Sequence, residues 1–246
     1  MGWNLHLFAD GYLLNHCLPS ALSYTERYSD AFVRLPRMDC VDIHCWPCPL
    51  AGPREVLQIC RHFHTDVRKV NFPMPDFLAT RLNRFHEADL VTWDEKNLSS
   101  VGRVSQEVLA IIEPTLRQIQ RLKRPIPTLP AQIIHGDLTG NILFDNASSI
   151  QPGIIDMTIY WRPAEYAEAI IVADGLVWHE QGRELLELYG TDGVRLQLLV
   201  RALYWRCICF AIDPDMDFVL AHIPKVDFLG AAHIVEGALE GIRSLS

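Results

Sequence analysis

The chain has 246 residues, of which 49% are hydrophobic and 21% charged, a composition typical of a globular protein with a sizeable core. Its formal net charge of -8 argues against non-specific nucleic-acid binding, which requires a basic face. No stretch is apolar for long enough to cross a bilayer, and the first residues lack the basic region and cleavage pattern of a secretory signal. The seven scattered cysteines fit a reducing compartment, so we expect a cytoplasmic protein.

The first fifty residues predict short strands, at 3–8, 32–35 and 41–46. Near their end, Cys45 and Cys48 form a C-x-x-C pair, with Cys40 and His44 close by. Such a cluster is a set of structural thiols, a redox pair or a metal site. Structural thiols are favoured, because no second spaced pair follows for zinc and the nearby prolines oppose the helix that a redox motif opens.

Helical spacing of apolar residues begins at Pro53, a residue suited to the first position of a helix. His62 and His64 fall on this helix two residues apart, so they face different ways and are interpreted as packing or surface residues. Pro114 is expected to kink or divide the second helix. The predicted helices cover the region from 53 to an extended break at 71–75, and then 104–124, 164–178, 195–212 and 231–243.

The most informative stretch contains three short apolar runs of strand type, at 133–134, 142–144 and 153–155. A polar loop with His135, Asp137 and Asn141 lies between the first two runs, and Asp156 follows the third. The oxygens of Asn141 and Asp156 are ligands that Mg²⁺ prefers, alongside substrate phosphates. Asp137 is suited to accept the proton of an attacking hydroxyl, and His135 to brace the loop. Alternatively, Asp and Asn here simply cap turns.

These residues resemble a known family. HGDL at 135–138, Asn141 and the Ile155-Asp156 pair are similar to the catalytic and metal-binding segments of the aminoglycoside phosphotransferase and choline kinase superfamily, which has the protein-kinase-like fold. The stretches HGDLTGNILF, IIDMTIYWRPAEYAEAIIVAD and PDFLATR resemble an uncharacterised, mainly actinobacterial branch of it. The resemblance runs from about Pro53 to the end of the printed sequence.

The resemblance implies an α+β protein with a reduced or divergent N-terminal lobe at 1–52 and a mostly helical, kinase-like C-terminal lobe at 53–246. The catalytic loop would be 133–144 and the metal-binding segment 153–163. The implied reaction is phosphorylation of a small-molecule hydroxyl with ATP and Mg²⁺. Asp137 would be the base, with His135 bracing its loop. Asn141 and Asp156 would hold the metal, and Asp174 would support the catalytic loop from a buried helix.

The sequence departs from this family in two ways. Asn141 follows Asp137 by four residues, where many members have five. No lysine precedes Lys69 and no G-x-G is found before it, although the nucleotide lobe of this fold normally supplies a glycine-rich loop and a lysine. Arg34 or Arg37 either substitutes for the lysine or is a surface residue. The alternative function is therefore a catalytically inactive, kinase-like binding or interaction module.

Two further features leave alternatives open. Residues 161–163 either shape a substrate mouth or form a packed connector. The acidic residues Asp213, Asp215 and Asp217 are expected in a solvated loop, the alternative being a site for an amine. Neither the acceptor alcohol nor the oligomeric state follows from the sequence, because one fold serves many substrates.

Overall fold

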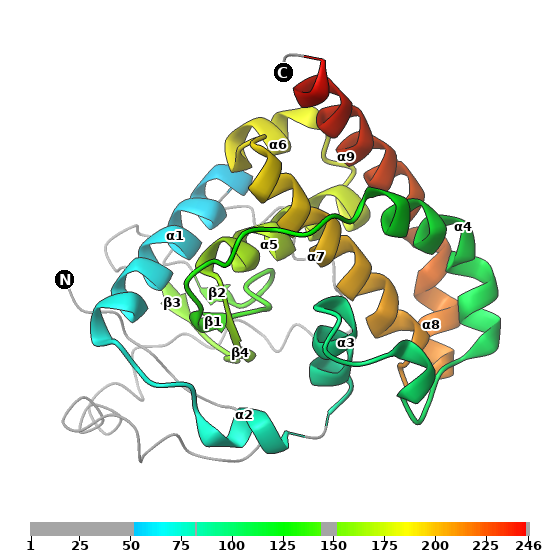
Figure 1. Ribbon diagram of the computed structural model, residues 1–246, viewed down its shortest axis with the longest axis horizontal. Coiled ribbons are helices and arrows are strands. Elements are labelled where there is room, and N and C mark those ends of the chain that lie inside the picture. Colours follow the sequence, from blue (N-terminus) through cyan, green and yellow to red (C-terminus); the bar gives the residue numbers. More distant parts are fainter. Residues whose placement is uncertain (1–51, 82, 144–151, 245–246) are drawn as a thin grey trace.

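The computed structural model describes residues 52–81, 83–143 and 152–244. Several sequence predictions lie outside these residues. They concern the strands before residue 52, the cysteine cluster (Cys40, His44, Cys45 and Cys48), the candidate phosphate-binding arginines (Arg34 and Arg37) and the end of the second apolar run (Phe144). The described part is mostly helical with two small antiparallel sheets, which is an α+β structure (Figure 1).

The elements follow one another in a helix-rich order. The helices are α1 (Pro53–Val70), α2 (Asp76–Thr80), α3 (Arg84–Thr92), α4 (Gln106–Leu122), α5 (Ala164–Trp178), α6 (Arg183–Tyr189), α7 (Gly193–Ala211), α8 (Met216–His222) and α9 (Phe228–Arg243), with short 3-10 turns η2 (Leu98–Ser100) and η3 (Ile223–Lys225). The strands are β1 (Gln132–His135), β2 (Ile142–Leu143), β3 (Gly153–Ile154) and β4 (Ile159–Arg162).

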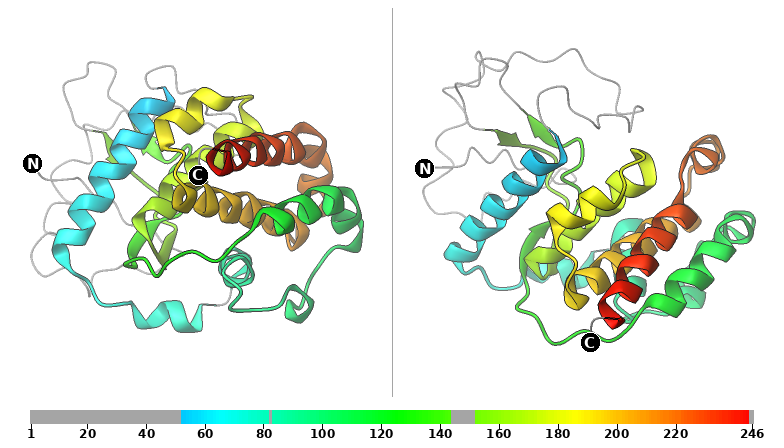
Figure 2. Two further views of the ribbon diagram at one scale, coloured as in Figure 1. Left: turned by 45° about the horizontal axis from the view of Figure 1, so that its top comes forward. Right: turned by 90° about the horizontal axis from the view of Figure 1, so that it is seen from above.

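Helix α7 is the centre of the described structure. It packs against α3, α4, α5 and α9, while α1 packs on the other side of α5 and against β1. The views agree on this order, with α1 at one flank and α4 and α9 side by side at the other (Figures 1 and 2). The residues that carry the candidate motif therefore lie against the two most buried helices, α5 and α7.

Helix α1 forms where the sequence predicts it, and it extends to Val70. Pro53 occupies its first turn, and Glu55 accepts a hydrogen bond from the backbone N–H of Gly52 at 2.9 Å. Its buried stripe comprises Val56, Leu57, Ile59, Cys60, Phe63 and His64. The helix ends at Asn71, which adopts the left-handed conformation with φ 52°, a conformation that asparagine tolerates well.

The helix predicted at 164–178 is confirmed as α5, and the one predicted at 195–212 begins two residues earlier, as α7. Residues 166–177 of α5 are all buried, which explains why this helix shows no amphipathic stripe. Asp192 caps α7 by accepting from the backbone N–H groups of Val194 and Arg195, both at 3.0 Å. Both helices bury charged residues that must find partners inside the protein.

The strands pair as two separate antiparallel ladders. β1 pairs with β4, with His135 opposite Ile159, and β2 pairs with β3, with Ile142 opposite Ile154. Each apolar run of the motif thus contributes a strand within the described residues, but the first of them pairs with a strand that the sequence interpretation treated as a connector. Of the two effects expected of Pro114, a kink or a division of the second helix, the division is wrong, since α4 runs continuously from Gln106 to Leu122.

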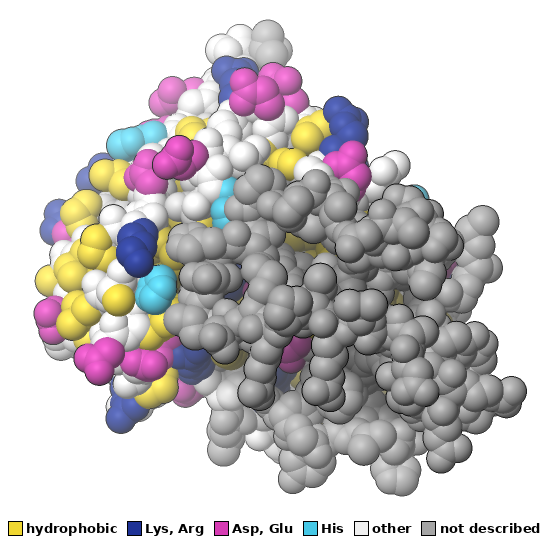
Figure 3. All heavy atoms as spheres, turned by 180° about the vertical axis from the view of Figure 1, so that it is seen from behind, with side chains coloured by type: hydrophobic (Ala, Val, Ile, Leu, Met, Phe, Trp, Pro, Cys, Tyr) yellow, Lys and Arg dark blue, Asp and Glu magenta, His cyan; other side chains and the backbone are white. Residues whose placement is uncertain are grey.

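Seen from behind, the described surface carries interspersed acidic and basic side chains among apolar ones (Figure 3). Within the described ranges, no single helix has the length and apolar composition to span a membrane. The pair formed by α8–η3 and α9, bent by 51°, meets that test only when taken together.

Candidate functional site

Two loops meet at the end of the β1–β4 ladder. The first follows β1 and holds Asp137 and Asn141, and the second connects β3 to β4 and holds Asp156. The N–H of Gly136 donates to the carbonyl of Thr158 at 2.8 Å, and the N–H of Ile155 donates to the carbonyl of Asn141 at 3.0 Å. These backbone bonds fasten the two loops to each other, so the candidate residues belong to one hydrogen-bonded unit.

His135 fixes this unit from inside. Its ring is buried, its Nδ1 accepts from the backbone N–H of Asp137 at 3.1 Å, and its Nε2 donates to the carbonyl of Ile155 at 3.1 Å. Burial lowers the pKa of His135, and the carbonyl of Ile155 opposes this only in part. Both ring nitrogens of the neutral imidazole are therefore engaged with the backbone, which makes His135 a brace rather than a proton carrier.

His64 supports the same unit from α1. Its Nδ1 donates to the carbonyl of Cys60 at 2.8 Å, and its Nε2 accepts from the backbone N–H of His135 at 3.0 Å. Complete burial lowers its pKa from 6.5 to about 3. Of the two alternatives for this residue, packing is therefore confirmed, and its role as a hydrogen-bonding link between α1 and β1 was missed by the sequence interpretation.

Acidification should destabilise the protein through His64. The folded ring stays neutral down to about pH 3, whereas in the unfolded chain it gains a proton near 6.5, so stability is lost as the pH falls between these values. Between pH 7 and pH 5 the loss is about 2 kcal/mol from this residue. Urea unfolding at both pH values measures it.

The matched variants for that measurement are His64→Gln and His62→Gln. Glutamine at 64 retains a donor and an acceptor but does not titrate, so the fall in stability between pH 7 and pH 5 should shrink. His62 is an exposed histidine on the same helix, and its replacement should leave the fall unchanged. An equal fall in both variants would show that another group is responsible.

Asn141 is oriented by its own loop. Its Nδ2 donates to the carbonyl of Asp137 at 2.6 Å, and its backbone N–H donates to the carbonyl of Leu138 at 3.0 Å. Because the NH₂ group is occupied by a carbonyl, the side-chain oxygen is the atom left to meet a ligand. The amide therefore offers an oxygen donor of the type that a hard cation prefers.

Asp156 directly follows Ile155, the residue bonded to the backbone of Asn141. It is exposed and adopts φ 51°, a left-handed conformation rare for residues other than glycine but tolerated by Asp and Asn. Its carboxylate makes no hydrogen bond or ion pair with another of the described residues. Sparsely populated backbone conformations of this kind concentrate at functional sites.

The set of oxygen donors is small. Within the described ranges, no group of three or more His, Cys, Asp and Glu side chains is arranged to hold a metal ion. Asn141 and Asp156 together offer one amide oxygen and one carboxylate. This set fits Mg²⁺, which often takes one or two carboxylates and completes its shell with substrate phosphates and water.

Asp137 contacts a residue that the sequence interpretation missed. Its Oδ1 accepts from Nη2 of Arg206, on α7, at 2.9 Å. The same guanidinium binds both oxygens of Asp174, through Nε to Oδ1 and Nη2 to Oδ2, each at 2.6 Å. Burial raises the pKa of Asp174, and Arg206 counteracts that rise. The only sequence signal was an arginine inside an otherwise apolar stretch, WRCICFA.

The resemblance implies that Asp174 supports the loop. Both of its carboxylate oxygens accept from Arg206, which in turn binds the side chain of Asp137, and Thr139 of the loop acts with Arg206 against the rise in the pKa of Asp174. Asp174 is only 2% exposed, and a buried carboxylate requires a charged partner. The arginine meets that need and reaches the loop at the same time.

Gly136 is fixed by packing rather than by backbone conformation. A Cβ atom at this position would lie 2.4 Å from two ring carbons of Tyr160. The tyrosine is 2% exposed and packs edge-on against Trp205 at a centroid distance of 6.0 Å. The middle residue of the HGD motif must therefore be small enough for the ring of β4 to cross it.

Both alternatives for residues 161–163 have support, since Trp161, Arg162 and Pro163 line a cavity of about 270 Å³ and Arg162 also acts as a connector. Its guanidinium donates to the carboxylates of Asp89 and Glu95, with distances of 2.6–3.2 Å. The expectation of a solvated acidic loop is wrong for Asp213, which is buried and paired with Arg84. Such partners tie neighbouring elements together.

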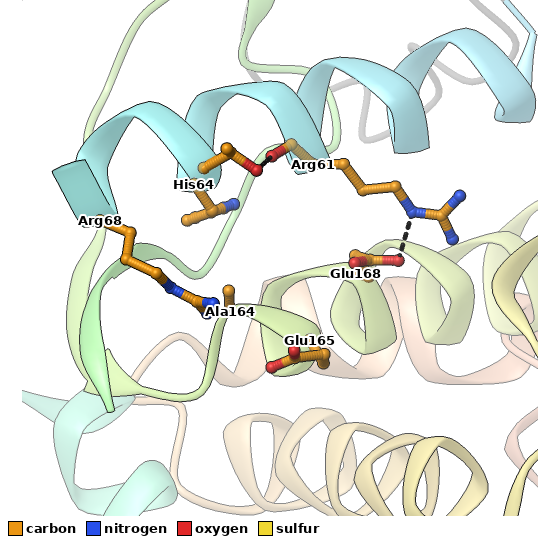
Figure 4. A pocket seen from close by; sticks show the side chains of 7 residues that line it. Arg61, His64, Arg68, Ala164, Glu165 and Glu168 are labelled. Atoms are coloured by element: carbon orange, nitrogen blue, oxygen red, sulfur yellow. Dashed lines mark hydrogen bonds and ion pairs between the residues drawn. The ribbon is translucent and has the colours of Figure 1, made fainter. Parts of the chain in front are cut away.

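A small cavity of about 110 Å³ lies between α1 and the first turns of α5 (Figure 4). It is lined by Arg61, His64, Thr65, Arg68, Ala164, Glu165 and Glu168. Arg61 Nε pairs with Glu168 at 2.8 Å, and Arg68 Nε donates to Gln132 at 2.7 Å. With two arginines and two glutamates facing it, the cavity favours neither an anion nor a cation.

Comparison with models of known protein families, with curated protein sequences and with solved structures gave no significant match.

Proposed function

We propose that the chain is a small-molecule phosphotransferase with a protein-kinase-like fold, which uses ATP and Mg²⁺ to phosphorylate a hydroxyl group. The observation that carries the proposal is the hydrogen-bonded unit around His135. This residue binds both loops, and Asn141 binds the carbonyl of Asp137 and the N–H of Ile155. A proton acceptor and two oxygen ligands are thereby held on one braced element, as phosphoryl transfer requires.

Each residue has a role that follows from its contacts. Asp137 is 39% exposed and binds Arg206 through Oδ1, which leaves Oδ2 to accept the proton of an alcohol. The side-chain oxygen of Asn141 and the carboxylate of Asp156 would hold Mg²⁺. When bound, that ion supplies positive charge to the phosphates of the nucleotide. His135 keeps the loop in place, and Asp174 supports it through Arg206 and Thr139.

In this proposal residues 53–246 form the kinase-like C-terminal lobe. The acceptor is a small molecule carrying a hydroxyl. Residues 1–51, on which the prediction of a reduced nucleotide lobe rests, lie outside the described residues.

The proposal is tested by thermal unfolding with Mg-ATP. At a concentration 100 times Kd, a ligand of the native state adds about 2.7 kcal/mol of stability, which raises Tm by roughly 5–10 °C for a chain of this size. Asp156→Ala should abolish the rise, and ATP without Mg²⁺ should give a smaller one. No rise in the unaltered protein at millimolar Mg-ATP would contradict the proposal.

The control for that variant is Asp94→Ala. Asp94 is also an exposed aspartate in the left-handed conformation, with φ 61°, and its carboxylate pairs with Lys123 away from the two loops. Its replacement imposes the same kind of backbone cost. The Mg-ATP rise should therefore survive in this variant while it disappears in Asp156→Ala.

A second candidate is a non-catalytic, kinase-like binding module. The ion pair between Asp137 and Arg206 favours it, because this contact fastens the loop to α7 and so has a structural role even without catalysis. The sequence adds that no lysine precedes Lys69. Mg-ATP binding without ADP release, over a panel of small alcohols, would support the module over the enzyme.

A further inference from the structure

The guanidinium of Arg206 is held more firmly than the Asp137 carboxylate to which it donates. Its two bonds to Asp174 are planar and paired, a geometry that fixes the orientation of the group. Asp174 lies on α5 and Arg206 on α7, and these two helices pack directly against each other. The guanidinium also lies over the ring of Trp205, 4.6 Å from its centroid, and is 15% exposed.

Asp137, by contrast, extends from a loop. The last torsion of an aspartate side chain is broad, so its carboxylate rotates freely unless something holds it. The bond from Arg206 Nη2 to Oδ1 supplies that restraint at 2.9 Å. With Oδ1 occupied, Oδ2 is the oxygen left for an incoming group, and the position of the carboxylate is tied to the two helices.

We propose that Arg206 is a positioning residue, which fixes the Asp137 carboxylate and its loop in the orientation needed to receive a hydroxyl proton. The catalytic part of this inference rests on the proposed function. Correct placement of a reacting group matters, because a displacement of about 1 Å can cost roughly a hundredfold in rate. The guanidinium of Arg206 bonds to Asp137 and Asp174 and not to Asn141 or Asp156, so metal and nucleotide binding should not depend on it.

Arg201 provides a matched comparison on the same helix. It is buried, and its guanidinium donates to the carbonyls of Gln197 and Arg124, at 3.1 and 3.0 Å. Like Arg206, it lies near a tryptophan ring, that of Trp93. These contacts lie outside the two loops, so replacing Arg201 disturbs α7 without touching the candidate site.

The experiment compares Arg206→Gln, Arg206→Lys and Arg201→Gln by amide hydrogen exchange. In Arg206→Gln, exchange of the loop peptide covering 136–142 should rise at least about tenfold more than that of α4 and α9. Arg201→Gln should accelerate exchange without selecting the loop. Arg206→Lys should lie between, since an ammonium holds one carboxylate oxygen but lacks the planar fork.

Enzyme assays add a second readout. In Arg206→Gln, ADP release should fall about a hundredfold, while the rise in Tm with Mg-ATP persists, and Arg206→Lys should recover part of the turnover. If Arg206→Gln does not fold, Arg206→Lys, which keeps the charge but not the planar fork, carries the same comparison with Arg201→Gln.

Loop exchange that merely follows global exchange, as in Arg201→Gln, would overturn the inference. Turnover in Arg206→Gln equal to that of the unaltered protein would overturn it as well. If the unaltered protein neither binds Mg-ATP nor releases ADP, the proposed function fails. Even then, a selective rise of loop exchange in Arg206→Gln would support the inference that Arg206 positions Asp137. The absence of a selective rise would refute that inference.

Discussion

Replacing Asp137 by asparagine should reduce ADP release by a factor of about 10²–10⁴, the usual worth of a positioned general base. Asparagine keeps an oxygen that can accept from Arg206, so the contact now made at 2.9 Å can persist. Its amide nitrogen, however, cannot take up the proton of an alcohol. The fold should therefore survive while proton transfer does not.

The measurement is ADP release over a panel of small alcohols, together with thermal unfolding of the same samples. Asp217→Asn changes an exposed aspartate on α8 and should leave both readouts unaltered. The rise in Tm with Mg-ATP should remain in Asp137→Asn, because the proposed metal ligands are intact. Undiminished turnover would remove Asp137 from the mechanism.

Gly136→Ala should lower the free energy of unfolding by roughly 3 kcal/mol, the upper end of the usual cost of overpacking a core. The added methyl group would meet the ring of Tyr160 at 2.4 Å. The ring has little room to move, because Trp205 packs against it and β4 holds its backbone against β1. The backbone of Gly136 is also restrained by its bond to Thr158.

Urea unfolding tests this expectation, with Gly237→Ala as the control. Gly237 is an exposed residue inside α9, and a Cβ atom there would meet nothing within 4 Å. Alanine at this position should stabilise the helix by about 0.4–1 kcal/mol. If Gly136→Ala proved equally harmless, the contact with Tyr160 would not be the reason for a glycine in the motif.

The long helices could be predicted because each has a continuous signal. An apolar stripe marks α1, and a mostly apolar stretch with few charged residues marks α5 and α7. The short helices α2, α3, α6 and α8 were missed, since five to nine residues contain too few turns to establish a period. β4 was missed because its four residues, IYWR, lead directly into Pro163 and α5, so that they were interpreted as a connector.

The residues of the candidate site likewise fall into predictable and unpredictable ones. His135, Asp137, Asn141 and Asp156 lie close in sequence, so their order and spacing suggested a common site. Arg206 lies 69 residues beyond Asp137, and its role depends on which side of α7 faces the loop. His64 lies 71 residues before His135 and contacts its backbone. Contacts of this range come from packing, which a local pattern does not encode.

The link from His64 to His135 has a consequence for ligand binding. Together with the ion pair to Arg206, it ties the loop to α1, α5 and α7. A loop held at both of these points has little conformational entropy left to lose when a ligand arrives, so most of the interaction energy remains available as affinity. The entropy cost of recognition would then fall on the ligand itself.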